Sequence, residues 1–160
     1  MNQAIEVLLD HLAQGNRLFH ACLEGLSFEE LHRRGSIHTN SMLWIAGHVT
    51  LYRHRLLGMV GEELEFPWTD LFARGSEPAA PDRYPEAADI IRSWDTVTQH
   101  IERRLPQVEE KEWSRPSPRP YPVQDQTLRG AVCFLGFHEA YHLGQMAYVR
   151  RILGRPRVTG

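Results

Sequence analysis

Two histidines at helical spacing carry the clearest chemistry in this sequence. His138 and His142 lie four positions apart in the segment FHEAYHLGQ, residues 137–145. On an α-helix this spacing places two side chains on one face, about 40° apart around the axis and one turn apart along it. Two imidazoles so placed can bind one metal ion. The segment therefore predicts part of a metal site, whose remaining ligand must come from elsewhere in the chain.

A third histidine lies where a leucine would be expected. His48 falls on the apolar stripe of a predicted helix over residues 42–57, just as His138 and His142 fall on the stripe of the last predicted helix. Each buried imidazole needs a polar partner, and one divalent ion would satisfy all three. We therefore predict one mononuclear metal site, in preference to three unrelated hydrogen-bonded histidines. Of the nine histidines, the six expected at the surface are His11, His20, His32, His38, His54 and His100.

Three neutral nitrogen ligands favour a catalytic site, because they leave at least one coordination position for water or substrate. An ion held in this way can lower the pKa of a coordinated water or thiol and so produce a nucleophile at neutral pH. Imidazole ligation suits zinc, nickel, copper or iron(II) and disfavours magnesium and calcium. We expect one divalent transition metal, with zinc and nickel the first candidates.

Two other metal motifs overlap the same residues. His138 to His142 reads as the H-E-x-x-H motif of zinc metalloproteases, in which Glu139 would be the general base. Those enzymes usually take a third ligand downstream, but the 18 residues after His142 contain no His, Asp or Glu. Glu139 and His142 also form the Glu-x-x-His pair of di-iron bundles, which require a second such pair and two further inward glutamates. The other predicted stripes lack carboxylates, so a mononuclear site fits better.

Four segments show the 3–4 spacing of apolar residues that is typical of a helix with one buried face. They span about residues 2–25, 42–57, 85–105 and 127–153. Ser27 and Glu30 form a capping box that predicts a short extra helical turn, and Gly58 and Pro106 are expected to end the second and third helices. The buried stripe predicted for the last helix is Leu128, Ala131, Leu135, His138, His142, Gln145, Val149 and Ile152.

Long connections separate the later helices. Residues 58–84 are of the length that usually serves a function or crosses a bundle, and Trp68 and Phe72 are expected to anchor them, as packing residues or as pocket lining. Residues 109–126 contain four prolines at alternate positions from 116 to 122, which favour an extended path. We interpret this second segment as a rigid connection between packed helices.

A few polar residues on the stripes are candidates for a substrate pocket or for catalysis. Asn16, Tyr52 and Gln145 share stripes with apolar residues or with the histidines, and Asn16 can equally be a satisfied structural amide. Glu139 is the one catalytic candidate. We favour for it a hydrogen bond that supports a ligand or joins two helices, with a role as base toward bound water as the alternative.

Composition indicates an ordinary globular protein of one domain over residues 1–160. Apolar residues make up 42% and charged residues 24% of the chain, and the net charge is −2. This balance provides no electrostatic footprint for nucleic acid or an anionic membrane, and no apolar run is long enough to span a bilayer. Two cysteines, Cys22 and Cys133, do not form a disulfide framework. A cytoplasmic location is therefore expected.

Taken together, several motifs resemble those of the DinB-like (damage-inducible) family of metal-binding four-helix bundles. The resemblance covers nearly the whole chain, and its most specific part is HEAYHLGQ at residues 138–145. The other matching segments are Asn16–Arg17, LSFEEL at 26–31, WIAGH at 44–48 and RRILG at 150–154.

The resemblance implies an all-α, up-down-down-up four-helix bundle, with long connections between helices 2 and 3 and between helices 3 and 4. It implies that His48, His138 and His142 bind one ion near one end of the bundle, and that the protein often forms homodimers. Some members look like enzymes that use a low-molecular-weight thiol such as bacillithiol or mycothiol for transfer, or that isomerise maleylpyruvate.

Two functional hypotheses follow. The first is a metal-dependent enzyme that acts on a small-molecule substrate, as a thiol-dependent S-transferase or a hydrolase. The second is a stress-associated binding or structural protein whose ion staples the helices together, because Glu139 is the one acid or base in view near the predicted ligands.

Overall fold

Helices are the regular secondary structure of the part that the computed structural model describes, residues 3–158. This confirms the all-α class, and no β-strand occurs among the described residues apart from one isolated bridge between Pro116 and Thr127. Residues 1–2 and 159–160, which include the expected start of the first helix at residue 2, lie outside this range. The long helices are α1 (Gln3–Leu23), α3 (Met42–Met59), α5 (Ala87–Arg104) and α6 (Leu128–Ile152), and the short ones are α2 (Phe28–His32) and α4 (Thr69–Phe72).

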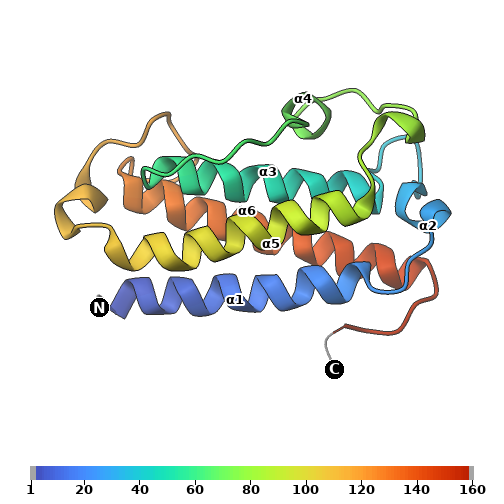
Figure 1. Cartoon of the computed structure of the whole chain (residues 1–160), viewed down its shortest axis with the longest axis horizontal. Helices are drawn as coiled ribbons and strands as arrows, with labels where there is room; N and C mark the ends of the chain where they lie inside the picture. Colours follow the sequence, from blue (N-terminus) through green and yellow to red (C-terminus); the bar gives the residue numbers. More distant parts are fainter. Residues whose placement is uncertain (1–2, 159–160) are drawn as a thin grey trace.

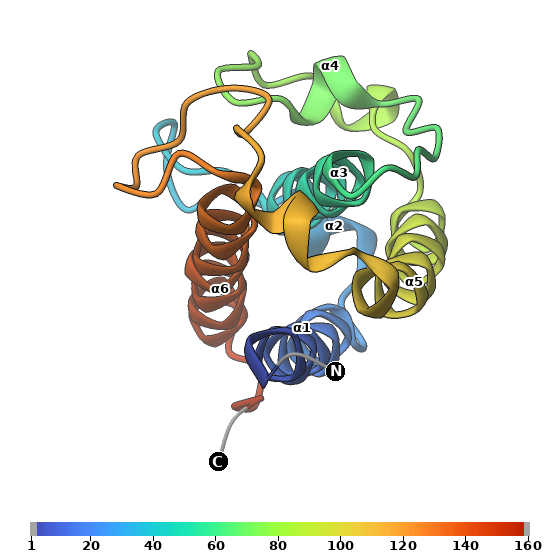
Figure 2. The ribbon, with the colours of Figure 1, turned by 90° about the vertical axis from the view of Figure 1, so that its left-hand side faces the viewer.

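The four long helices pack side by side. Contacts link α3 to α5 and α6, and α1 to α6 and α5, and Figure 2 shows the four helices nearly end-on. In Figure 1, α1 and α6 run in one direction while α3 and α5 run in the other. α3 is the most enclosed of the four, because α2 and α4 also pack against it. Buried residues accordingly occur all around its circumference rather than on one stripe.

None of the described helices is both long enough and apolar enough to cross a membrane. This agrees with the lack of a membrane-length apolar run in the sequence.

The helix ends follow local signals, with one correction. The Ser27 hydroxyl accepts a hydrogen bond from the backbone N–H of Glu30, and the Glu30 carboxylate accepts one from the backbone N–H of Ser27, so the predicted capping box is present. The expectation that Gly58 ends the second long helix is wrong, since α3 continues through Gly58 to Met59. The chain turns at Gly61, whose φ of 88° lies in the region that glycine adopts without steric cost.

The connections contain short helical turns. The chain after α5 forms 3₁₀ turns at Leu105–Gln107 and Glu110–Ser114, and the second of these buries Trp113. The proline segment is therefore less extended than we expected, although the prolines at 116–122 themselves lie outside any helix. In the earlier connection, α4 buries Phe72 completely against α3.

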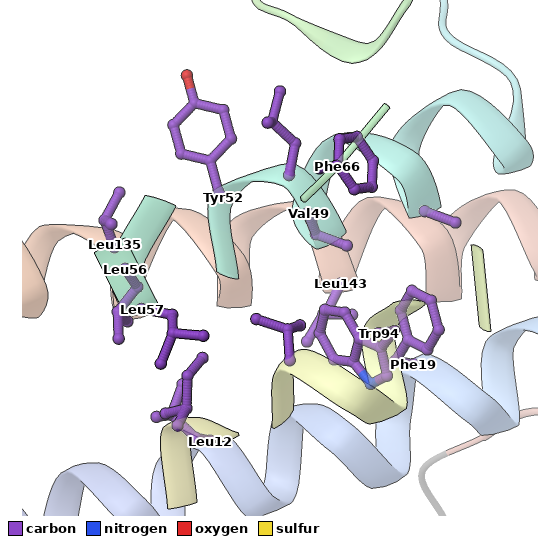
Figure 3. Packing of buried hydrophobic residues seen from close by; sticks show 14 of the residues in the cluster. Leu12, Phe19, Val49, Tyr52, Leu56, Leu57, Phe66, Trp94, Leu135 and Leu143 are labelled. Atoms are coloured by element: carbon purple, nitrogen blue, oxygen red, sulfur yellow. The ribbon is translucent and has the colours of Figure 1, made fainter. Parts of the chain in front are cut away.

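Apolar side chains from all four long helices meet in one core. Figure 3 shows Phe19 of α1 against Trp94 of α5, with Leu143 of α6 nearby. Val49 and Leu57 of α3 belong to the same core. The rings of Phe19 and Trp94 are nearly parallel, with centroids 3.9 Å apart. Stacked aromatic pairs contribute about 0.5–1.5 kcal/mol beyond the area they bury.

The buried face of α6 differs from the predicted stripe. Its core-facing positions after Leu135 are Glu139, Leu143, Met146 and Arg150, while His138, His142 and Gln145 lie half-buried beside that line and Ile152 is exposed. The prediction failed because hydropathy counts Glu139 and Arg150 as surface residues, whereas each has buried partners. Arg150 donates hydrogen bonds to the carbonyl of Cys22 in the last turn of α1 and to the carbonyl of Glu24 just after that helix.

A buried ion pair joins the four long helices at one point. Arg53 of α3 and Glu139 of α6 are 2% and 5% exposed. The arginine Nε and Nη2 donate to the two carboxylate oxygens of Glu139, each at 2.7 Å. Arg53 also donates to the carbonyl of Leu12 in α1 at 2.9 Å and to the hydroxyl of Thr98 in α5. Its guanidinium carbon lies 3.6 Å from the centroid of the Trp94 ring.

Space for this pair depends on Gly15 in α1. A Cβ atom at that position would lie 2.3 Å from the Glu139 carboxylate, a distance that no pair of non-bonded atoms tolerates. The glycine therefore lets α1 approach α6 closely where the ion pair is held.

We predict that Glu139→Ala destabilises the protein by about 3–5 kcal/mol, because it leaves the Arg53 guanidinium charged and unpaired in the core. Urea unfolding of the metal-free protein measures this loss. The double variant Arg53→Met with Glu139→Leu is expected to recover most of the stability, since no charge then remains buried. The exposed residue Glu102 provides the control Glu102→Ala; an effect of Glu139→Ala as small as that of the control would contradict the assigned role.

Candidate metal centre

Three histidine nitrogens converge on one point between α3 and α6. The Nε2 atom of His138 lies 3.3 Å from Nε2 of His48 and 3.2 Å from Nε2 of His142. Two nitrogens bound tetrahedrally at about 2.0–2.1 Å from one ion are about 3.3–3.4 Å apart. The spacing of these atoms thus matches a shared ion closely. Among the described residues, these three form the one group of His, Cys, Asp and Glu side chains that could hold a metal.

Hydrogen bonds on the outer nitrogens set the protonation of the inner ones. Nδ1 of His48 lies 2.7 Å from the carbonyl oxygen of Phe72, and Nδ1 of His142 lies 2.7 Å from Oε1 of Gln145. Both partners are acceptors, so each Nδ1 carries the proton of a neutral ring and each Nε2 presents a lone pair. This is the tautomer that a metal ligand requires.

His138 then has no satisfactory arrangement without a cation. Its Nδ1 is buried without a hydrogen-bond partner in the described structure. If the His138 proton is on Nε2, it can be donated to Nε2 of His48 or to Nε2 of His142, but not to both. If the proton is on Nδ1, the Nε2 lone pairs of all three histidines point at one another. A metal ion removes this conflict by accepting all three lone pairs. The donor set therefore fits a divalent transition metal.

Burial keeps the three rings neutral at neutral pH. Desolvation lowers the pKa of His48 to about 4 and, together with the charges of His142 and His48, that of His138 to about 3. Desolvation also lowers the pKa of His142. Because a protonated imidazole cannot bind a metal, these shifts keep the lone pairs available.

The connection after α3 positions His48. The Phe72 ring lies directly over Gly47, where a Cβ atom would come within 2.3 Å of it, and the Phe72 carbonyl accepts the His48 hydrogen bond. The indole of Trp44 stacks on the imidazole of His48 with centroids 4.6 Å apart. Phe72, considered at first as an anchor or a pocket residue, is thus an anchor that also orients a ligand.

Two of the three expected pocket residues lie beside the histidines. The ring of Tyr52 stacks on that of His138 with centroids 4.2 Å apart, and its hydroxyl end points away from α1 and α5 (Figure 3). Gln145 contacts His142 through the hydrogen bond described above. Asn16 instead accepts a hydrogen bond from the Trp94 indole at 2.7 Å, between α1 and α5. Of its two expected roles, the structure gives Asn16 that of a satisfied structural amide.

Glu139 makes the interhelix hydrogen bonds that we favoured over a role as base. Both of its carboxylate oxygens accept hydrogen bonds from Arg53, so the residue serves the core rather than the face on which the histidines converge. A protease-like arrangement, in which this glutamate activates water, does not fit the observed pairing. Neither does a di-iron site, because no carboxylate joins the three histidines in the described structure.

Sequence reasoning missed Arg53 and misplaced His54. Arg53 lies four residues after Val49 and three before Leu56, a spacing that could have marked it as buried. His54, expected at the surface, is 8% exposed. Its ring contacts the Ser93 hydroxyl at 2.9 Å and the Leu64 carbonyl at 3.3 Å, so it is a satisfied core histidine apart from the metal group.

Comparison with known proteins agrees with the geometry of the site. The family model of the DinB superfamily matches residues 11–146, a range that includes all three histidines. The chain is also similar to an uncharacterised protein, YuaE, of Bacillus subtilis (strain 168). The two are 26% identical over 148 residues, which cover 83% of this chain and 91% of that protein.

We predict that His138→Ala abolishes stoichiometric metal binding while the helical content changes little, because the ring lies beside the core rather than within it. Elemental analysis after reconstitution, paired with circular dichroism, measures both quantities. His38→Ala, at an exposed position outside the metal group, is the matched control. Full metal content in the His138 variant would show that the site is assigned wrongly.

Proposed function

Because this chain belongs to the DinB superfamily, we propose that it is a metal-dependent enzyme built on His48, His138 and His142. The observation that carries the proposal is the convergence of three imidazoles, in which Nε2 of His138 lies 3.3 Å from Nε2 of His48 and 3.2 Å from Nε2 of His142. Its support is chemical as well as geometric, since hydrogen-bond acceptors at Nδ1 of His48 and His142 set the tautomer that leaves Nε2 free to bind a metal.

The donor set suggests both the kind of ion and what it would do. Three imidazoles suit zinc or nickel, and they leave at least one coordination position for a small ligand. When bound, such an ion supplies Lewis acidity, which lowers the pKa of a coordinated water or thiol. The protein's own part is to hold the three rings rigidly. The Phe72 carbonyl orients His48 and Gln145 orients His142, while the Tyr52 ring covers one face of His138.

We favour thiol-dependent transfer or hydrolysis as the reaction class, acting on a small molecule. The family resemblance supports a low-molecular-weight thiol as co-substrate. In the structure, the support is indirect: with Glu139 bonded to Arg53, no carboxylate in the described metal group can act as base. Activation of the nucleophile would then rest on the ion, and a thiol, which ionises more readily than water, needs less activation.

The ion pair between Glu139 and Arg53 favours one alternative, in which the metal ion has only a structural role and cross-links α3 to α6. A metal that joins two helices contributes to folding whether or not it reacts. This alternative predicts an ion with no exchangeable water or thiol position, whereas the enzyme requires one.

We further propose that the long helices form an up-down-down-up bundle and that the protein is a homodimer, as the family resemblance implies. The directions of the helices in Figure 1 and the contacts among them support the first point. Exposed aromatic side chains on α6 support the second, since Phe137, Tyr141 and Tyr148 are 66%, 58% and 68% exposed. Light scattering of the purified protein distinguishes monomer from dimer.

We expect metal-dependent turnover when protein loaded with zinc or nickel is given low-molecular-weight thiols together with electrophilic acceptors. Loss of thiol and formation of the thioether product are measured. His48→Ala should reduce the rate to the uncatalysed background, because it removes a ligand, while His38→Ala should leave the rate unchanged. Protein that binds a full equivalent of metal but turns over no member of the panel would exclude the transferase and support the structural alternative.

A further inference from the structure

A groove of about 600 Å³ lies on the side of α3 that the two long connections cover. Its floor is the C-terminal half of α3, and its walls come from residues 63–69 before α4 and residues 115–121 of the proline segment. Leu51, Met59, Leu64 and Phe66 provide apolar surface within it. Neither the proposed metal site nor the family match assigns any role to this groove.

Two of the three arginines in the groove are not paired with a carboxylate within residues 3–158. Arg55 and Arg119 line it, and neither has a carboxylate partner among the described residues. A third arginine, Arg115, is paired with Glu112 and donates to the Met59 carbonyl. The groove contains one carboxylate, the exposed Glu63. His54, at its edge, adds no charge because burial lowers its pKa.

Tyrosine rings hold the two free guanidinium groups. The guanidinium carbon of Arg55 lies 4.7 Å from the centroid of the Tyr52 ring, and that of Arg119 lies 4.9 Å from the centroid of the Tyr121 ring. Arg119 also donates a hydrogen bond to the Tyr121 hydroxyl at 3.1 Å. Stacking on an aromatic face restricts an arginine and leaves in-plane N–H donors for an oxyanion. In Arg119 the Nε–H group is already donated to Tyr121, so the remaining N–H groups would bind the anion.

Tyr52 connects this groove to the three histidines. One neighbour of its ring is Arg55, and another is the imidazole of His138, whose centroid is 4.2 Å away. Arg55 therefore lies next to the metal site, with one aromatic ring between it and His138, without being part of the ligand group.

We propose that the groove binds the carboxylate or phosphate group of an organic substrate through Arg55 and Arg119, and that this holds the reactive end of the substrate toward the three histidines. The inference rests on the proposed function for the position of the reaction, but the anion site itself is independent of the metal. The apolar wall would accept the body of the molecule, so the substrate class is a small organic anion rather than an inorganic ion.

Binding of matched probes tests the proposal. Benzoate, phenyl phosphate and the neutral analogue benzamide are titrated into metal-loaded protein, and amide shifts are followed by nuclear magnetic resonance. The wild-type protein should bind one or both anions and bind benzamide at least about tenfold more weakly. Arg119→Gln, Arg55→Gln and their combination should weaken anion binding about tenfold or more while metal content stays unchanged. Arg17→Gln, at an exposed position on α1, is the matched control.

The outcomes separate this inference from the proposed function. Equal binding of benzamide, unchanged anion binding in the Arg55 and Arg119 variants, or no binding of either anion would overturn it. The stronger of benzoate and phenyl phosphate identifies which oxyanion the site prefers. Anion binding that persists in His138→Ala supports an anion site that does not need the ion. The inference of an anion site would therefore stand even if the wild-type protein held no metal.

Discussion

The buried ion pair between Arg53 and Glu139 constrains the rest of the structure. It takes one partner from α3 and one from α6, and Arg53 also bonds to α1 and α5, so the relative rotation of the four long helices is determined at one layer. His138 directly precedes Glu139, and adjacent residues on a helix point about 100° apart. With Glu139 turned into the core, His138 and His142 must face the side of the helix pair where His48 lies.

The long connection after α3 has a similar effect on the other side of the site. It places Phe72 over Gly47 and brings the Phe72 carbonyl to His48. A loop carbonyl therefore selects the tautomer of a ligand that a helix supplies. The same connection, with the proline segment, forms the walls of the arginine-lined groove. Segments without long helices thus provide both the support of the metal site and the candidate substrate surface.

Two electrostatic environments lie next to each other as a result. The three imidazoles are half-buried or buried and neutral, as ligands for a cation should be. The groove beside them has two guanidinium groups that have no carboxylate partner in the described part of the chain, and such groups suit an anion. Tyr52 stands between the two and contacts a residue of each. In this arrangement the arginines would bind the anionic end of a small molecule, and the opposite end of that molecule would face the metal ion.

Local sequence signals predicted the helices, the Ser27–Glu30 capping box and the positions of three histidines on two of the helices. These follow from short-range spacing, because helix periodicity and capping depend on residues a few positions apart. The partners of Glu139, Arg53, Arg150 and His54 are visible only in the folded chain. Each is a polar residue whose burial depends on a partner from a distant segment, which a hydropathy pattern does not contain. The meeting of Arg55 and Arg119 was decided in the same way, by how the two long connections fold over α3.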